Sequence, residues 1–301
     1  MPNFNGVWSL TTQLQYAADW PIVDRTIALF GGGDENKNVI DTVSFVAAAN
    51  ATDFGDLTVA RGYHASVASS TRGVWGGGSG SSRSNVIDYV TIASAGNAQD
   101  FGDLLSVNSA LTALSNNTRG VFIGGYNGSA DQNVLQYITI ASTGNAQDFG
   151  DAQAAHNYGS ACASTTRGVF LEGNTDKYSY ITIGSTGNAT DFGDALSGKT
   201  GASACSNSTR GIFGGAGSGD LEYITIASTG NGTDFGNLSA TRNNFGACAS
   251  SITGMFAGGN SNQDVIDTVT ISTTGDATDF GNLSVARALY SGALSNGHGG
   301  I

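Results

Sequence analysis

The chain has 301 residues, of which 45 are glycine and two are proline, and charged residues make up 12% of it. This charged share is about half of the usual one, and so much glycine indicates many turns and few helices. The net charge of −12 would repel phosphate backbones, which excludes DNA or RNA as a partner. No run of 18 apolar residues occurs, and residues 1–20 lack the basic start and apolar stretch of a signal peptide. We therefore expect neither membrane insertion nor secretion by that route.

Residues 1–24 form a leader that stands outside the pattern of the rest of the chain. It contains two of the three tryptophans, Trp8 and Trp20, with Leu10 and Leu14 between them. Apolar anchors of this kind predict docking, either into the chain's own fold or onto a neighbouring protein.

The tripeptide Asp-Phe-Gly recurs in residues 25–301 every 43 to 48 residues. It begins at Asp53, Asp100, Asp148, Asp191, Asp234 and Asp279. A period of this length, filled with short β-type runs and glycine, is typical of a β-propeller whose repeats each form one four-stranded blade. We predict that residues 25–301 form one all-β domain, a six-bladed propeller in which the motif is architectural.

The second repeat shows the expected blade. Its four strands are predicted at 61–69, 72–78, 86–92 and 98–104. Large side chains on both faces of the third strand suit a sheet that is sandwiched between two neighbours. The glycines after the second strand supply the positive φ of a sharp turn.

Aromatic residues recur in two positions of the repeat. The second strand carries Phe30, Trp75, Phe122, Phe170, Phe213 and Phe256. The fourth strand carries Phe54, Phe101, Phe149, Phe192, Phe235 and Phe280. If each is buried, it stabilises the fold by about 1.5–3 kcal/mol, so we expect these residues to be core rather than a cofactor site.

The first repeat lacks a first strand of its own, because its pattern begins at Thr26 with the second strand. A sixth strand of the first type stands instead at 288–295. We predict that 288–295 pairs with 26–33, which closes the ring and leaves no exposed edge at the seam.

Cysteines and histidines fill repeat positions rather than forming a cluster. The three cysteines occupy a slot that is apolar in the other repeats: Cys162, Cys205 and Cys248 against Val67, Leu114 and Leu294. An odd number of thiols in separate blades predicts buried free cysteines rather than disulfides or zinc ligands. His156 stands eight residues after an Asp-Phe-Gly aspartate, where the other repeats have Arg61, Asn108, Lys199, Arg242 and Arg287. We therefore expect a polar structural residue there and no metal site.

Pairs of acidic residues surround the repeated glycine, as in Asp53 and Asp56. Together with nearby amide oxygens they could ligate calcium. The alternative is a structural turn in which the first aspartate pairs with a repeat arginine such as Arg72. Asn237 and Asn282 replace the second aspartate in two repeats, which favours the structural alternative. We expect no cofactor, with calcium kept as the open alternative.

The loops between the second and third strands vary most in length and content. They span 34–38, 79–85, 126–133, 174–177, 216–220 and 260–264. We expect all of them to emerge on one face. Loops on a rigid scaffold commonly carry recognition, so this face is the candidate binding surface. The candidate binding residues are Asp34, Glu35, Lys37, Arg83, Tyr126, Asn127, Lys177 and Asn260. Such side chains suit hydrogen bonding to sugars, and equally a solvated turn.

The repeat resembles the kelch repeat. The likeness rests on a Gly-Gly pair after the second strand, an aliphatic-Tyr third strand, and a closing Leu-x-x-x-Arg at 57–61 and 283–287; Phe stands where kelch has Trp. The phrase Tyr-Ile-Thr-Ile-Ala-Ser-Thr-Gly-Asn at 137–145 and 223–231, followed by Asp-Phe-Gly, resembles repeats in structural proteins of tailed, notably marine, bacteriophages. The segments at 5–10 and 19–21 resemble the leader that precedes such repeats.

The resemblance implies a virion component of a phage tail or fibre, made in the host cytoplasm and oligomeric in its assembly. We expect a non-catalytic protein that contacts other virion proteins through residues 1–24 and presents loops to a receptor such as a host-surface glycan. One alternative is a lectin that acts alone. A less favoured one is a polysaccharide hydrolase, in which Glu172, standing where other repeats have glycine, would be the candidate acidic residue.

Overall fold

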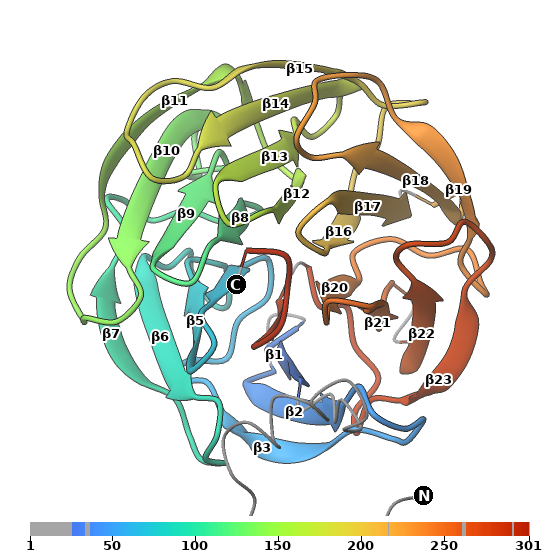
Figure 1. Cartoon of the computed structure of the whole chain (residues 1–301). Helices are drawn as coiled ribbons and strands as arrows, with labels where there is room; N and C mark the ends of the chain where they lie inside the picture. The colour runs from blue at the N-terminus through green and yellow to red at the C-terminus, as the bar shows by residue number, and fades with distance from the viewer. Residues whose placement is uncertain (1–25, 34–36, 216, 261–262, 291, 301) are drawn as a thin grey trace, which may run out of the picture.

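The computed structural model describes residues 26–33, 37–215, 217–260, 263–290 and 292–300. Within these ranges the chain forms 24 strands, in six four-stranded antiparallel sheets that stand in a ring (Figure 1). The predicted six-bladed β-propeller is therefore confirmed. The described residues include no helix that is long and apolar enough to cross a membrane.

Each blade has four strands, named a to d from the axis outward, and the blades are numbered 1 to 6 along the chain. In that order the a strands are β24 (Ala293–Ser295), β4 (Ala65–Ala68), β8 (Thr112–Ser115), β12 (Ser160–Ala163), β16 (Ala202–Ser206) and β20 (Gly246–Ala249). The b strands are β1 (Ile27–Gly31), β5 (Arg72–Gly76), β9 (Arg119–Ile123), β13 (Arg167–Leu171), β17 (Arg210–Gly215) and β21 (Thr253–Ala257). The c strands are β2 (Val39–Ser44), β6 (Val86–Thr91), β10 (Gln132–Thr139), β14 (Lys177–Thr182), β18 (Asp220–Thr225) and β22 (Val265–Thr270). The d strands are β3 (Thr52–Asp56), β7 (Gln99–Asp103), β11 (Gln147–His156), β15 (Thr190–Asp194), β19 (Thr233–Asn237) and β23 (Thr278–Asn282).

The last strand closes the ring as predicted. β24 pairs with β1 in an antiparallel register that sets Leu294 opposite Leu29, so blade 1 combines both ends of the described chain. The a strands are shorter than expected: β4 begins at Ala65, not at Arg61, and β24 begins at Ala293. The reason is that residues before β4 form the connection between blades, with Tyr63 at a φ of 57° that no strand can include.

The hydrophobic core lies between neighbouring blades rather than inside any one of them. Leu29 and Phe54 of blade 1, for example, share a buried cluster with Trp75 and Val90 of blade 2. All six aromatic residues of the b strands are fully buried. Those of the d strands are buried too, except Phe280, which is half-buried. The prediction of two rings of core aromatics is confirmed.

The Asp-Phe-Gly motif joins each blade to the next. In blade 3 the backbone N–H groups of Gly187 and Ala189, from the neighbouring blade, donate to the carbonyls of Phe149 and Asp151, both at 2.8 Å. Gly150 has a φ of 146°, and a Cβ there would lie 2.5 Å from the Gly187 carbonyl oxygen. Glycine is required because two backbones meet at this point. The six motif aspartates are exposed, so the motif is architectural, as expected.

The arginines that begin four b strands do not pair with these aspartates, which corrects the structural alternative. Each arginine instead lies over the ring of a tyrosine in the adjacent c strand and donates to a carbonyl of the next blade. Arg119, for example, lies 4.3 Å from the ring centroid of Tyr137 and donates 3.0 Å to the Ile183 carbonyl. The same clasp occurs at Arg72, Arg167 and Arg210. Thr253 and Ile27 replace the arginine in blades 6 and 1, beside Thr268 and Thr42 in place of the tyrosine.

The polar position eight residues after each motif aspartate forms a second, inner set of bonds. Arg61, Arg242 and Arg287 are buried there and pair with aspartates of the next c strand, at 2.8 to 3.0 Å. Lys199 lies 3.8 Å from Glu222 in the same arrangement. These cations stand in the connections between blades, and they hold each connection to the blade that it enters.

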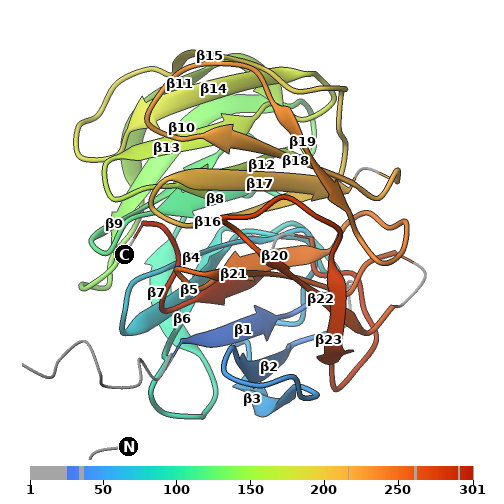
Figure 2. The ribbon, with the colours of Figure 1, turned by 45° about the vertical axis from the view of Figure 1, so that its right-hand side comes forward.

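The two ends of the propeller differ. The b–c loops and the connections between blades emerge at one end, which we call the loop face. The a–b and c–d turns emerge at the other end, which we call the turn face. Figure 1 shows the last segment of the chain in the middle of the ring, and Figure 2 shows the ring obliquely, turned by 45°.

Candidate functional site

The connections between blades meet around the axis at the loop face. Each contributes one residue with positive φ: Tyr63 (57°), Ala110 (54°), Tyr158 (54°), Gly201 (66°), Asn244 (55°) and Tyr290 (47°). All six line one small cavity at the axis. A left-handed backbone costs an L-residue about 1–2 kcal/mol, and such strain clusters at ligand-binding sites. Bulky tyrosines at three of these positions therefore point to a use beyond folding.

Tyr63 is the centre of an aromatic cluster. Its ring centroid lies 3.9 Å from that of Tyr290, and the two hydroxyls are 3.1 Å apart in a hydrogen bond. The Tyr158 ring meets it edge-on at 6.0 Å. All three side chains are half-buried. Contacts of this kind are worth about 0.5–1.5 kcal/mol each, so the rings are oriented before any ligand arrives.

A cleft of about 230 Å³ opens beside this cluster, over blades 2 and 3. Tyr63 and Tyr158 line it from the connections, while Arg83 and Tyr126 line it from the b–c loops. The other lining residues are Ser79, Ser109, Ala110 and Asn157. Aromatic faces beside convergent hydrogen-bonding groups are typical of small-ligand sites.

Backbone bonds fix the loops that carry this cleft. Ser79 and Gly62 exchange N–H···O bonds of 2.8 and 2.9 Å, and Ser79 also bridges to Arg83. Tyr126 and Ser109 exchange bonds of 2.7 and 3.1 Å. Both loop bases are thus joined to the connections beside them, and the cleft is preformed.

Arg83 is the cation of the cleft. Its Nε donates 3.2 Å to the Ser109 hydroxyl, and its guanidinium lies 4.6 Å from the Tyr126 ring centroid. Within the described ranges Arg83 forms no ion pair, and no bond from its terminal Nη1 and Nη2 is present. Burial raises the pKa of Tyr158, as does Tyr63, and the Arg83 charge opposes this rise. The Arg83 side chain is exposed, so it is available to a ligand.

A chain of amide hydrogen bonds forms the rim of the cleft. Asn157 donates 2.7 Å to Asp131 and accepts 2.9 Å from Asn174. Thr200 in turn donates 2.8 Å to Asn174. This network links the loop face of blades 3, 4 and 5, and it orients the Asn157 side chain that lines the cleft.

The structure brings some of the predicted binding residues together and separates others. Arg83 and Tyr126 share the cleft, and Asn127 beside them accepts bonds from two backbone N–H groups of its own loop. Lys177 pairs with Asp194 at 2.5 Å instead. Asn260 accepts a bond from Asn244, and Lys37 is half-buried with its carbonyl bound by the backbone N–H of Arg61. Asp34 and Glu35, and the leader anchors Trp8, Leu10, Leu14 and Trp20, lie outside the described residues.

Sequence reasoning missed the tyrosines of the connections. The repeat pattern places Tyr63 and Tyr158 at strand starts, because it predicts a strands that begin near Arg61 and its equivalents. A usable signal is present, since both stand two residues after the polar position of the repeat, where other blades have Ala110, Gly201 and Asn244. The repeat itself does not require a large aromatic in this slot, because other blades have alanine or glycine there.

The inner ion pairs are absent beneath the blade 3 side of this cleft, whereas blade 2 keeps the buried pair of Arg61 and Asp88. Blade 3 has the neutral Asn108 and Gln136 in these positions, and blade 4 has His156 and Ser179. Glu172 is buried next to this last pair and accepts a 2.9 Å bond from the Ser179 hydroxyl. It therefore supplies from the end of the b strand a carboxylate that other blades place on the c strand.

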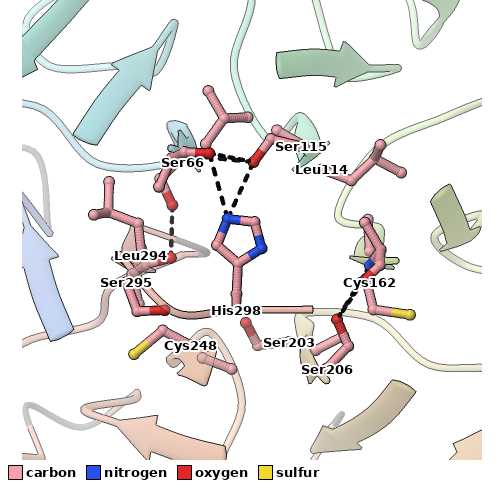
Figure 3. Close-up of a pocket in the computed structure, with 18 of the residues that line it drawn as sticks. Ser66, Leu114, Ser115, Cys162, Ser203, Ser206, Cys248, Leu294, Ser295 and His298 are labelled. Carbon is pink, nitrogen blue, oxygen red and sulfur yellow. Dashed lines mark hydrogen bonds between the residues drawn. The ribbon is translucent and has the colours of Figure 1, made fainter. Parts of the chain in front are cut away.

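The channel at the turn face holds residues 296–300. Figure 3 shows His298 in the middle of the ring of a strands, with Nε2 3.3 Å from the Ala68 carbonyl and 3.4 Å from the Ser115 hydroxyl. Burial lowers the pKa of His298 to about 4, although the Ala68 carbonyl opposes this. The remaining cavity is about 80 Å³ and is lined mostly by small residues and serines. Two of the three cysteines, Cys162 and Cys248, stand among them.

All three cysteines are buried free thiols, as predicted. Burial raises the pKa of each of them, which makes them poor nucleophiles. Within the described ranges no group of three or more His, Cys, Asp or Glu side chains is placed to hold a metal ion.

Comparison with protein-family models finds no match, and comparison with curated proteins finds none either. Function therefore rests on the residues and the geometry of the cleft.

Proposed function

We propose that the protein is a non-catalytic adhesive propeller that binds a host-surface glycan at the cleft of the loop face. The observation that carries this proposal is the set of oriented tyrosines at strained backbone positions beside a preformed cleft of about 230 Å³. Tyrosine offers a flat apolar face for a sugar ring and a hydroxyl for its polar edge. The cleft spans blades 2 and 3, so a specific site breaks an otherwise regular ring.

We further propose, on the kelch-like and phage-like repeats, that this propeller belongs to a bacteriophage tail or fibre and oligomerises in its assembly. The leader would then contact other virion proteins. The cavity left beside residues 296–300, about 80 Å³, offers little room for tryptophan side chains in the propeller's own channel. This favours docking onto a neighbour over the alternative of self-plugging.

The hydrolase alternative gains no support from Glu172. Its carboxylate is buried and engaged by Ser179, and Glu172 is not among the residues that line the cleft. A lectin that acts alone would use the same cleft, so only the location of the chain distinguishes it from a virion protein.

The glycan proposal is tested on the full-length protein with an array of bacterial surface polysaccharides. We expect binding that falls about tenfold or more in Tyr126→Ala, since losing an aromatic contact commonly costs about 1–3 kcal/mol. Lys177→Gln, an exposed change on the same face but outside the cleft, should leave binding unchanged. An array without binding, or equal loss in both variants, would contradict a glycan site at this cleft.

The virion proposal is tested by mass spectrometry and particle imaging. We expect the chain in purified phage particles, and we expect a chain without residues 1–24 to be missing from them while its melting temperature stays unchanged. Failure to find the full-length chain in particles would favour the lectin.

A further inference from the structure

We propose that the cleft is specific for acidic sugars, with Arg83 as the residue that binds the ligand's carboxylate or sulfate. This inference rests on the proposed glycan-binding function and adds the chemical class of the ligand. It follows from the position of one cation in a protein of net charge −12.

The first argument is the disposition of the other positive charges. Three arginines and Lys199 are buried in ion pairs, four arginines stack on tyrosines or donate to carbonyls at the turn face, and Lys177 pairs with Asp194. Each of these cations serves the fold itself. Lys37 also forms no ion pair in the described part of the chain, but it is half-buried and does not line the cleft. Arg83 differs in that it is exposed, lines the cleft and pairs with no carboxylate in those residues.

The second argument is that Arg83 is held in place without being neutralised. Its Nε bond to Ser109 and its stacking on Tyr126 orient the planar guanidinium. The two terminal amino groups remain for a ligand, and their fork geometry matches a carboxylate or sulfate. A flat cation next to flat aromatic faces suits a sugar ring that carries an anionic substituent.

The third argument is that the acidic side chains around the cleft are bound by other residues and do not neutralise Arg83. Asp131 stands on the rim but accepts a bond from Asn157 rather than pairing with Arg83. On the blade 3 side, beneath the cleft, Asn108 and Gln136 replace the charged pair of other blades. On the blade 2 side the buried Asp88 is paired with Arg61 at 2.8 Å, so it does not compete for Arg83. An anionic ligand therefore meets one cation inside an otherwise repulsive surface, which makes binding selective for molecules that reach Arg83.

The test uses the full-length protein and an array of uronate-bearing, sulfated and neutral glycans. We expect the retained glycans to be acidic and their affinity to fall about tenfold in Arg83→Met, the loss expected for a hydrogen-bonded charge. Arg83→Lys should recover part of it. Chemical reduction of the uronate carboxyls of the best ligand to alcohols keeps its linkages, and this neutral form should bind weakly to the wild type and show no further loss in Arg83→Met.

Salt supplies a second measurement, because an exposed ion pair is screened and sugar stacking is not. Affinity for the acidic glycan should drop as NaCl is raised from about 0.05 to about 0.5 M, a range over which exposed charges become screened. Affinity for the reduced glycan should not change. If only neutral glycans bind, or if Arg83→Met binds acidic ones normally, the acidic specificity is wrong and the glycan function stands. If nothing on the array binds, both proposals fail.

Discussion

Arg287 and Asp41, 246 residues apart in the chain, form a buried 3.0 Å ion pair across the seam of the propeller. The seam lacks the outer arginine–tyrosine clasp, because Thr253 and Thr268 take its place in blade 6. The inner arginine–aspartate pair is present at that junction and at the next one, where blade 1 meets blade 2. The junctions between blades 2 and 3 and between blades 3 and 4 show the reverse, with outer clasps and neutral inner residues. Each junction thus has the outer arginine–tyrosine clasp, the inner ion pair, or both.

Breaking the seam pair should destabilise the protein strongly. Arg287→Leu leaves Asp41 buried, with the backbone N–H and the hydroxyl of Ser284 as donors but no counter-charge. We expect the free energy of unfolding to fall by about 3–5 kcal/mol. Urea denaturation measures it. The double variant with Asp41→Leu should recover part of this loss. Lys177→Gln removes an exposed pair as the control and should change stability by less than about 1 kcal/mol; equal losses in the two single variants would refute the role of burial.

The motif glycine should tolerate no side chain. In Gly150→Ala the new Cβ would lie 2.5 Å from the Gly187 carbonyl oxygen, at a φ of 146°. We expect a loss of about 2 kcal/mol or more in the free energy of unfolding, from strain and a displaced junction. Gly184→Ala is a matched control in the adjacent blade, because nothing lies within 4 Å of its Cβ and other repeats have alanine there. Equal melting temperatures for the two variants would mean that the blades are not held at this contact.

Stability should fall in acid through the buried histidines. Burial lowers the pKa of His298 to about 4 and that of His64 to about 3, below the ordinary 6.5. The folded state thus binds fewer protons than the unfolded one, so their contribution is complete above pH 6.5 and is lost as the pH falls toward 4. For His298 the loss amounts to at most about 3 kcal/mol. Unfolding free energies from about pH 7.5 to 4.5 should show a shallower slope in His298→Gln; an unchanged slope would contradict this.

Calcium should have no effect on stability. The motif aspartates are exposed, and the backbone N–H groups three residues after them are bonded to side chains of the next blade, as Asp151 N–H is to Asn188 at 3.0 Å. The acceptor is an asparagine except in blade 5, where it is Asp276. Calorimetric melting temperatures with chelator and with millimolar calcium should therefore agree within the error. A fall of several degrees on chelation would instead establish calcium as a ligand of the acidic pairs.

Much of the fold could be predicted because each sequence repeat corresponds to one structural unit of the ring. Six copies of Asp-Phe-Gly fix the number of blades, and the displaced last strand at 288–295 implies the closure onto β1. The exact extent of the a strands could not be predicted, since Tyr63 and its equivalents leave the β region only because the connections must turn over the axis.

The candidate site was predictable only in part. Arg83 and Tyr126 belong to the b–c loops, and they were predicted because these loops differ in length and content from repeat to repeat. Tyr158 joins them through the curvature of the ring, which places a connection beside a loop from another blade. The stacking partner of Arg119 was likewise hidden, because Tyr137 and Asp148 both lie within reach in the sequence and only strand register selects between them.

The start of β1 and the segment after β24 adjoin each other, with the Ile27 N–H donating 2.8 Å to the Asn296 side chain. Both therefore stand at the turn face, whereas the cleft opens at the loop face. A molecule that is fastened through the leader at Thr26 can present Arg83 and the tyrosines outward at the same time. Attachment to a larger assembly and capture of a distant surface would then not compete for the same side of the protein.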